Sequence, residues 1–246
     1  MRIAVAGATG NIGRLTVGAL ERQGHEVVGI SRSLGLDLTT GAGPDDALVG
    51  VDAVVDVTNA PPLDEAGTVA HFRTTTSALL AAGARAEVTH HVLLSIVGVA
   101  QVAGNAHYAG KRAQERLVEA GQVPWTIVPA TQFHDFAAMV ADWTEADGVA
   151  TIAPLLVQPI APADVADVLA EVVVGPPSGR HADLAGPETQ DLVDMARRTH
   201  AARGRDVTLV PTWSGLFGPE MAGPVLLPGD GARIAPTTFE EWLATA

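Results

Sequence analysis

Apolar residues along the chain fall into short continuous runs separated by stretches in which they recur at helical spacing. The first run, residues 3–6, has the length of a buried strand and breaks at once into a glycine-spaced turn. Behind the turn, a helical pattern is formed by Ile12, Leu15, Thr16, Ala19 and Leu20. This pattern ends at Gly24, which suits a helix C-terminus, and residues 26–30 form the next run. Strand, glycine turn, helix and strand in this order predict the first unit of a dinucleotide-binding fold.

The alternation continues along the rest of the chain. Further strands are expected over residues 52–57, 90–98, 124–130, 180–184 and 207–210. Further helices are expected over residues 68–82, 105–121, 190–203 and 239–243, and one more begins near Asp164. The pattern predicts an α/β fold, and the Gly- and Pro-rich stretch at 175–179 is the best candidate for a domain boundary.

Three glycines space the first turn in the pattern G-x-x-G-x-x-G. Gly7 lets the strand turn sharply, Gly10 lets the backbone approach a pyrophosphate, and Gly13 lets the helix pack closely. The N–H groups at the helix start would bind the anion. The candidate contacts are Gly7, Thr9, Gly10, Asn11 and Ile12. A plain strand–turn–helix with chance glycines is the alternative, but the flanking strand and helix are the context that nucleotide binding requires.

The residues after the second strand select between NAD and NADP. An acidic residue there would bind the adenosine ribose hydroxyls, whereas this chain has Ser31, Arg32 and Ser33. Hydroxyls and an arginine suit a 2′-phosphate, so the sequence favours NADP(H), with NAD(H) as the alternative. A solvated Arg32 is the competing interpretation. Asp37 and Leu38 follow as candidate adenine contacts, although Asp37 also fits a simple turn.

In open α/β sheets, ligands bind at the carboxyl ends of the strands. This rule adds three groups of candidate cofactor contacts. They are Thr58, Asn59 and Ala60 after one strand, Ser95 at the end of another, and Pro129, Ala130 and Thr131 at a third. The adjacent His90 and His91 point to opposite faces of their strand, so no metal site is predicted.

One predicted helix carries the candidate proton-transfer groups. Tyr108, the only tyrosine, lies three residues before Lys111, and His107 lies four before it, so both spacings place the pair on one helical face. An ammonium beside a phenol lowers the pKa of the phenol and can hold a ribose hydroxyl, as a reductase requires. Ser95 is the candidate catalytic hydroxyl. A solvated pair of Lys111 with Glu115 is the alternative.

An apolar and aromatic cluster follows the strand over residues 124–130. Its members are Phe133, His134, Phe136, Met139 and Trp143. They are candidates for the wall of an apolar substrate pocket beside the nicotinamide. Ordinary helix core explains each of them equally well.

Composition narrows the functional classes. Hydrophobic residues make up 47% of the 246 residues, enough for a buried core, and the formal net charge is −13. That charge argues against general binding of nucleic acid or of anionic membranes. The absence of cysteine excludes disulfides, thiol catalysis and thiolate metal sites. No signal peptide and no apolar run long enough to cross a bilayer is found, so a cytoplasmic protein is expected.

Several motifs occur together in a characteristic order. They are the three glycines, Ser31-Arg32, Leu93-Leu94-Ser95, the helix with Tyr108 and Lys111, Pro124-Trp125-Thr126-Ile127 and Ala163-Asp164-Val165-Ala166. With them the chain resembles an atypical, extended-type short-chain dehydrogenase/reductase of the NmrA-like, NAD(P)H-binding group. The resemblance implies a Rossmann-type doubly wound parallel sheet with a small C-terminal substrate lobe. It implies a core of residues 1–132 completed by 156–174, and a lobe of 133–155 and 175–246.

The resemblance also implies a function. It implies an NADPH-dependent oxidoreductase that transfers hydride to a small, fairly apolar carbonyl, quinone or conjugated acceptor, with Arg32 on the 2′-phosphate and Lys111 on the nicotinamide ribose. Active reductases of this kind pair a tyrosine with a lysine four residues later, but here His107 holds that position and Tyr108 is turned by about 100°. A non-catalytic NADP(H)-sensing regulator and a cofactor-retaining isomerase or epimerase are therefore alternatives. The expected partner is a small-molecule substrate, and both monomer and homodimer stay open.

Overall fold

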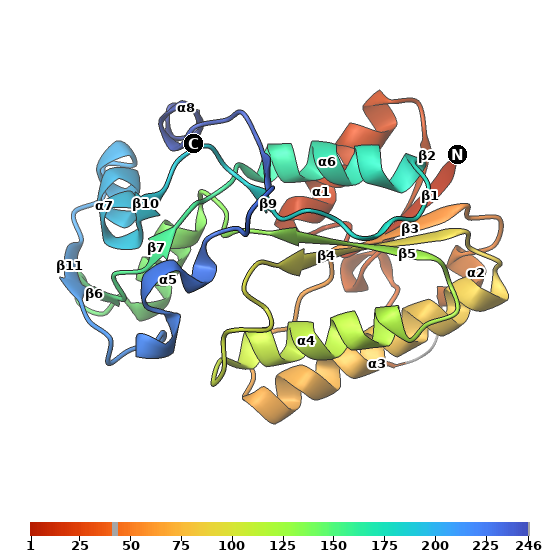
Figure 1. Ribbon diagram of the computed structural model, residues 1–246, viewed down its shortest axis with the longest axis horizontal. Coiled ribbons are helices and arrows are strands. Elements are labelled where there is room, and N and C mark those ends of the chain that lie inside the picture. The colour runs from red at the N-terminus through yellow and green to blue at the C-terminus, as the bar shows by residue number, and fades with distance from the viewer. Residues whose placement is uncertain (41–43, 246) are drawn as a thin grey trace.

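A parallel sheet forms the centre of the computed structural model, which describes residues 1–40 and 44–245. Its strand order is β12-β9-β5-β4-β3-β1-β2, with β8 also pairing with β5. The strands are β1 (Arg2–Ala6), β2 (Glu26–Ile30), β3 (Ala53–Asp56), β4 (His90–Ile96), β5 (Trp125–Ala130), β8 (Gly179–Arg180), β9 (Leu184–Ala185) and β12 (Arg233–Ile234). Because every pair is parallel, the carboxyl ends of β1 to β5 lie at one edge of the sheet (Figure 1).

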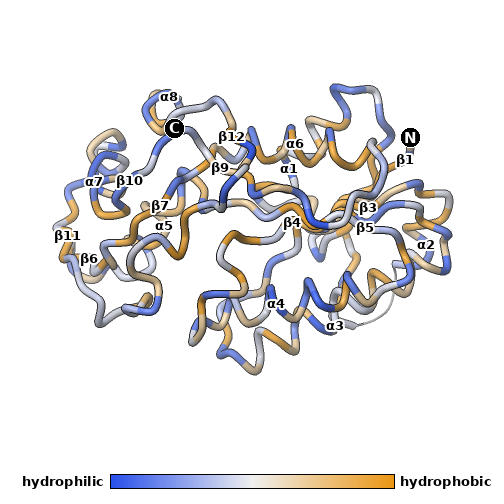
Figure 2. Tube along the Cα trace, in the orientation of Figure 1, coloured by the Kyte–Doolittle hydropathy of each residue, from blue (hydrophilic) through white to orange (hydrophobic). Residues whose placement is uncertain are grey.

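Helices cover both faces of this sheet. The helices α1 (Asn11–Arg22) and α6 (Pro162–Val174) pack together on one face, and α2 (Pro44–Ala47), α3 (Glu65–Arg85) and α4 (Ala106–Glu119) cover the other (Figure 1). Successive β1 side chains point to opposite faces of the sheet. Ile3 and Val5 join one apolar cluster, and Ala4 and Ala6 join another. Orange and blue segments alternate along α3 and α4 in Figure 2, as expected for helices with one buried face. The predicted Rossmann-type α/β fold is confirmed.

A smaller lobe lies beyond the carboxyl ends of β4 and β5, on the left of Figure 1. Its elements are α5 (Phe136–Thr144), β6 (Val149–Ile152), β7 (Leu156–Val157), β10 (Gln190–Asp191), α7 (Leu192–Ala202), β11 (Thr208–Pro211) and α8 (Phe239–Leu243), with 3-10 turns at Pro219–Met221 and Gly223–Leu226. The strands pair as β6 with β11 and β7 with β10. These elements enclose an apolar cluster of their own, which also takes in Tyr108 from the start of α4.

The division of the chain is more interleaved than the predicted one. Strands β8, β9 and β12 come from the stretch 175–246 that was assigned to the lobe, yet they extend the large sheet. Strand β7 comes from the stretch 156–174 assigned to the core, yet it pairs with β10. The single strand expected over 180–184 is two strands of two residues each. Such short strands leave no periodic signal in a sequence.

The boundaries of the longer elements follow local capping. The helix expected over 68–82 begins earlier, at Glu65, because the Asp64 side chain accepts a hydrogen bond from the Gly67 N–H. The helix expected near Asp164 begins at Pro162, a residue that favours the first helical position. Among the described residues, no helix is long and apolar enough to cross a membrane.

Candidate functional site

The glycine turn between β1 and α1 brings the helix start directly onto the strand end. A Cβ atom on Gly13 would lie 2.0 Å from the carbonyl oxygen of Gly7, so only glycine fits there. Gly7 itself has a φ of +86°, and a Cβ there would lie 2.9 Å from the Val57 oxygen. Gly10 caps the helix without a side chain, which leaves the first N–H groups of α1 open to an external acceptor.

This turn lies where the strand order reverses. The chain passes from β1 to β2 on one side and continues to β3 on the other. In open α/β sheets, the crevice at such a switch point is where a ligand binds. The glycine turn, the end of β2 and the residues after β3 therefore border one candidate site.

A chain of hydroxyl groups connects the glycine turn with the end of β2. Ser33 donates to the Thr9 hydroxyl over 3.0 Å, and the Ser31 and Ser33 hydroxyls are 3.1 Å apart. Arg32 is exposed beside them. Arg14 donates to the Thr9 carbonyl oxygen. These groups offer hydroxyls and a guanidinium in the arrangement that the sequence predicts for a 2′-phosphate.

Two predicted adenine contacts follow this segment. Asp37 accepts hydrogen bonds from the backbone and hydroxyl of Thr39, and these bonds, with a smaller contribution from Arg32, lower the pKa of its carboxyl group. Asp37 is thus a turn residue, whatever else it contacts. Leu38 is buried in the apolar cluster that also contains Ile30 at the end of β2, so its side chain does not face the candidate site.

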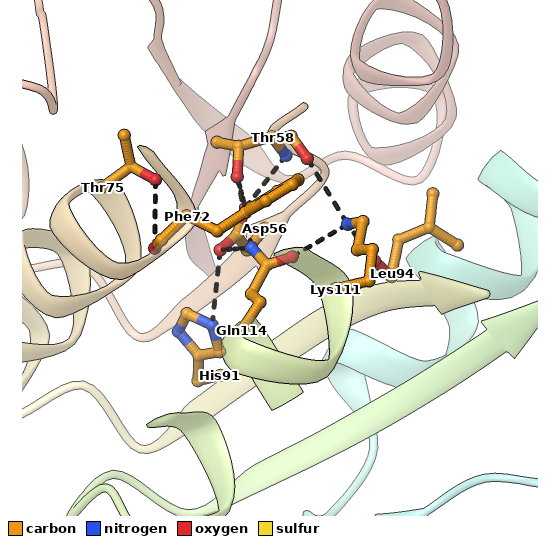
Figure 3. A network of polar contacts seen from close by, with 8 residues as sticks. All are labelled: Asp56, Thr58, Phe72, Thr75, His91, Leu94, Lys111 and Gln114. Carbon is orange, nitrogen blue, oxygen red and sulfur yellow. Dashed lines mark hydrogen bonds and ion pairs between the residues drawn. The ribbon is translucent and has the colours of Figure 1, made fainter. Parts of the chain in front are cut away.

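Lys111 is the centre of a buried polar network (Figure 3). Its ammonium donates to the Leu94 carbonyl oxygen over 3.0 Å and to the Gln114 side-chain oxygen over 2.9 Å. The carbonyl oxygen of Thr58 lies 3.5 Å away. Lys111 is only 6% exposed, and this burial lowers its pKa to about 8. A solvated surface pair with Glu115 is therefore the wrong interpretation, because both side chains are buried.

Ser95 does not share a hydrogen bond with Lys111 or Tyr108. Its hydroxyl donates to the Glu115 carboxylate, whose other oxygen accepts from Arg180 over 2.9 Å. The hydroxyl that the sequence predicts to be catalytic is thus engaged between β4 and α4.

His107 and Tyr108 point in different directions from the start of α4. Asn105 caps the helix by accepting from both of their backbone N–H groups, which fixes the helical phase. The His107 ring lies 6.2 Å from the ring of Phe72, and burial together with the charge of Lys111 lowers its pKa to about 4. Tyr108 faces the cluster of the lobe, and its hydroxyl accepts from the Gln132 amide over 3.2 Å.

The phenol of Tyr108 is expected to stay protonated in the folded protein far into the alkaline range. Burial raises its pKa well above the ordinary value of about 10. Because Tyr108 is the only tyrosine and the four tryptophans do not titrate, the change in absorbance at 295 nm with pH reports the ionisation of this group alone. The absorbance should stay flat until the protein unfolds, and in denaturant it should rise near pH 10. A folded-state midpoint at or below 10 would contradict the buried placement.

The other strand-end candidates lie at the same edge of the sheet. Thr58 donates through both its N–H and its hydroxyl to Asp56, whereas Asn59 is exposed and accepts from the N–H of Ala60. Pro129 and Ala130 are buried at the end of β5. The Thr131 hydroxyl donates to the Gln158 carbonyl oxygen, so Thr131 anchors the connection toward the lobe.

The five candidate substrate residues occupy different environments. His134 packs against Phe239 and Trp242 around α8, with both ring centroids 5.6 Å away, and its Nε2 lies 3.2 Å from the Thr237 carbonyl oxygen. Phe133 contacts the cluster under α6, and Phe136 packs on Phe217. Met139 and Trp143 are 38% and 60% exposed on α5. Packing therefore separates the residues that their helical spacing had grouped.

Sequence reasoning missed three polar residues at this edge. Gln114 accepts from the Lys111 ammonium and donates to Asp56, and Asp135 accepts from the side chain of Asn11 over 2.7 Å. An acid inside the apolar stretch 53–57 was the one available signal, and it points to Asp56 but to neither Gln114 nor Asp135. In the described part of the chain, no three His, Cys, Asp or Glu side chains are grouped so that they could hold a metal ion.

Residues 33–176 match the model of a family described as NAD(P)H-binding. A comparison with curated protein sequences finds no significant relative.

The fold is similar to that of the enzyme WbmH from Bordetella bronchiseptica in complex with NAD+, with a TM-score of 0.76, 17% identity, and coverage of 100% of this chain and 96% of that chain. Two further structures are similar to most of the chain. UDP-glucose 4-epimerase from Thermus thermophilus, complexed with NAD, has a TM-score of 0.68, 16% identity and 86% coverage of each chain. Triphenylmethane reductase from Citrobacter sp., complexed with NADP(H), has a TM-score of 0.64, 17% identity and coverage of 86% and 79%.

Proposed function

The chain belongs to the NAD(P)H-binding family, and on this premise we propose that it is an NADPH-dependent oxidoreductase acting on a small, fairly apolar carbonyl, quinone or conjugated acceptor. The observation that carries the proposal is the open start of α1 at the switch point of the sheet, with the buried ammonium of Lys111 at the same edge. The bound nucleotide would supply the hydride. The remaining tasks fall to residues of this chain.

The residues present fit a dinucleotide. The absence of Cβ atoms at Gly7 and Gly13 keeps the turn tight, and the free N–H groups of α1 can donate hydrogen bonds to a pyrophosphate. Arg32 and the hydroxyls of Ser31 and Ser33 would hold the 2′-phosphate. Lys111 would hold the nicotinamide ribose by exchanging its long 3.5 Å contact with the Thr58 carbonyl oxygen for a ribose hydroxyl.

His107 is the proposed polarising group for the acceptor. It lies four residues before Lys111 on the same face of α4, and because its pKa is lowered to about 4, its ring is neutral at pH 7. A neutral imidazole donates a hydrogen bond from one ring nitrogen and so can polarise a carbonyl oxygen. Tyr108 would support the site indirectly, through Gln132.

The orientation of Tyr108 favours a second candidate function, that of an NADP(H)-sensing regulatory protein. A chain whose only tyrosine is buried against the lobe lacks an accessible phenol for proton transfer. Such a protein would bind nucleotide and change its affinity for a partner with the NADP+/NADPH ratio. A pull-down with and without NADPH tests this, and the same partners under both conditions would contradict it.

Arg32→Ala is expected to weaken NADPH binding at least tenfold, about 1.4 kcal/mol, and to leave NADH binding unchanged. The reason is that only NADPH carries the 2′-phosphate that Arg32 would contact. Fluorescence titration with both nucleotides measures the two affinities. The matched control is Arg22→Ala on α1, where the arginine pairs with Asp167. Equal binding of NADPH and NADH by the unmodified protein would contradict the NADP preference.

Turnover tests the reaction itself. NADPH oxidation should be followed with aldehydes, ketones, quinones and conjugated enones as acceptors. Lys111→Met should remove turnover of whichever acceptor is reduced. Tight NADPH binding without turnover of any acceptor would overturn the oxidoreductase proposal and favour the sensor.

A further inference from the structure

Lys111 is the only lysine in a chain that has 14 arginines. Apart from the eight histidines, every other basic side chain is a guanidinium, so a compact ammonium is used at one buried position alone. An ammonium has three N–H donors, and three oxygen atoms lie within 3.5 Å of it: Leu94 O, Gln114 Oε1 and Thr58 O. The ring of Phe72 covers it at 5.1 Å. The surroundings are built for a charged amine.

Asp56 is the buried counter-charge of this network. Its side chain is fully buried, and its carboxylate accepts from the Thr58 N–H, the Thr58 hydroxyl and Gln114 Nε2. A buried carboxylate is costly unless it is hydrogen-bonded and its charge is compensated. His91 lies 3.9 Å away, but burial lowers the pKa of its ring and keeps it neutral. Lys111 is therefore the cation that compensates Asp56.

Gln114 connects the two charges. Its oxygen accepts from the Lys111 ammonium over 2.9 Å, and its NH2 group donates to Asp56 over 3.1 Å (Figure 3). The side chain is completely buried between α4 and the end of β3. The positive charge at one end and the negative charge at the other determine the orientation of the amide.

We propose that Asp56 and Gln114 are positioning residues for Lys111. The Asp56 carboxylate, acting through the Gln114 amide, keeps the Lys111 amine protonated and aims it at the carboxyl ends of β3 and β4. The role of Lys111 toward the nucleotide rests on the proposed function, whereas the effect on its protonation does not.

The charged and titratable groups around the Lys111 ammonium come from three elements. Strand β3 contributes Asp56, β4 contributes His91, which is neutral and lies 3.9 Å from Asp56, and α3 contributes the uncharged ring of Phe72. Helix α4 contributes Glu115, four residues after Lys111, and the neutral His107, four residues before it. Burial lowers the pKa of Lys111, whereas the charges of Asp56 and Glu115 raise it. Of these two charges, Asp56 has the larger effect. Removing that charge should lower the pKa further, toward neutrality.

The protonation of Lys111 can be measured directly. Protein labelled with ¹⁵N-lysine has one side-chain amine signal, because there is one lysine. The signal of the unmodified protein should titrate well below the ordinary lysine value of about 10.4. In Asp56→Asn and in Gln114→Leu the midpoint should fall by at least one further pH unit, a tenfold loss of proton affinity. Asp52→Asn, which removes a carboxylate just before β3, should leave the midpoint unchanged.

Nucleotide binding gives the second measurement. NADP+ affinity should fall as the pH rises through the Lys111 midpoint, and in Asp56→Asn this fall should move to lower pH by the same amount. An unchanged Lys111 midpoint in both variants, or an ordinary lysine midpoint in the unmodified protein, would overturn the inference. Shifted midpoints without NADP+ binding at any pH would support the inference and overturn the proposed function.

Discussion

Gly13→Ala is expected to abolish nucleotide binding and to destabilise the fold by about 1–3 kcal/mol or more. The new methyl group would lie 2.0 Å from the Gly7 oxygen, 2.8 Å from the Gly7 carbonyl carbon and 2.9 Å from the Ala8 carbonyl carbon. All three are backbone atoms, so no side chain can move aside. The start of α1 must then move away from the end of β1, and the N–H groups that would bind a pyrophosphate move with it. NADPH titration and urea unfolding measure the two effects.

The same helix offers a matched control. Gly18 lies in the middle of α1, and a Cβ there would meet only the end of the Arg22 side chain, at 3.5 Å. Gly18→Ala should therefore leave nucleotide binding intact and stabilise the protein by up to about 1 kcal/mol, because alanine favours the helix interior. If Gly13→Ala bound NADPH as tightly as Gly18→Ala, the close approach of α1 to the turn would not matter for binding.

The contrast between these two glycines shows what sequence can predict. The motif around Gly13 is local: strand, turn and helix are consecutive, so the spacing of residues determines their geometry. The cap at Asn105 is also local, but the sequence left open which of His107 and Tyr108 faces the cofactor. The fold class and the position of the glycine turn at the sheet edge could accordingly be predicted from the chain alone.

Contacts between distant segments could not be predicted in this way. The hydrogen bond from Asn11 to Asp135 joins residues 124 positions apart in the sequence, and the hydrogen bond from Gln114 to Asp56 joins residues 58 positions apart. Helical spacing placed Phe136, Met139 and Trp143 on one face of α5, but it does not reveal that α8 packs on the neighbouring His134. Which segment covers a helix face depends on the tertiary packing, and no periodicity reports it.

Mild acid is expected to reduce the free energy of unfolding by several kcal/mol between pH 7 and 5. Burial lowers the pKa of five histidines in the folded protein: His90, His91, His107, His134 and His200. Below about pH 6.5 the unfolded chain therefore binds more protons than the folded chain, and stability falls as the pH falls. Each such histidine contributes up to about 1.4 kcal/mol per pH unit until its folded-state pKa is reached. Asp135, whose pKa is raised by burial, acts in the opposite direction. Urea unfolding at a series of pH values measures the slope.

His200→Leu should make the protein less sensitive to acid. The His200 ring is 2% exposed, and neither of its nitrogens has a hydrogen-bond partner among the described residues. An apolar side chain of similar size therefore loses no hydrogen bond, so stability at pH 7 should be maintained or increased. Between pH 6.5 and 5 the slope should decrease by up to about 1.4 kcal/mol per pH unit, since one proton-binding site of the unfolded chain is gone. An unchanged slope would mean that the His200 ring titrates alike in both states and is open to solvent when folded.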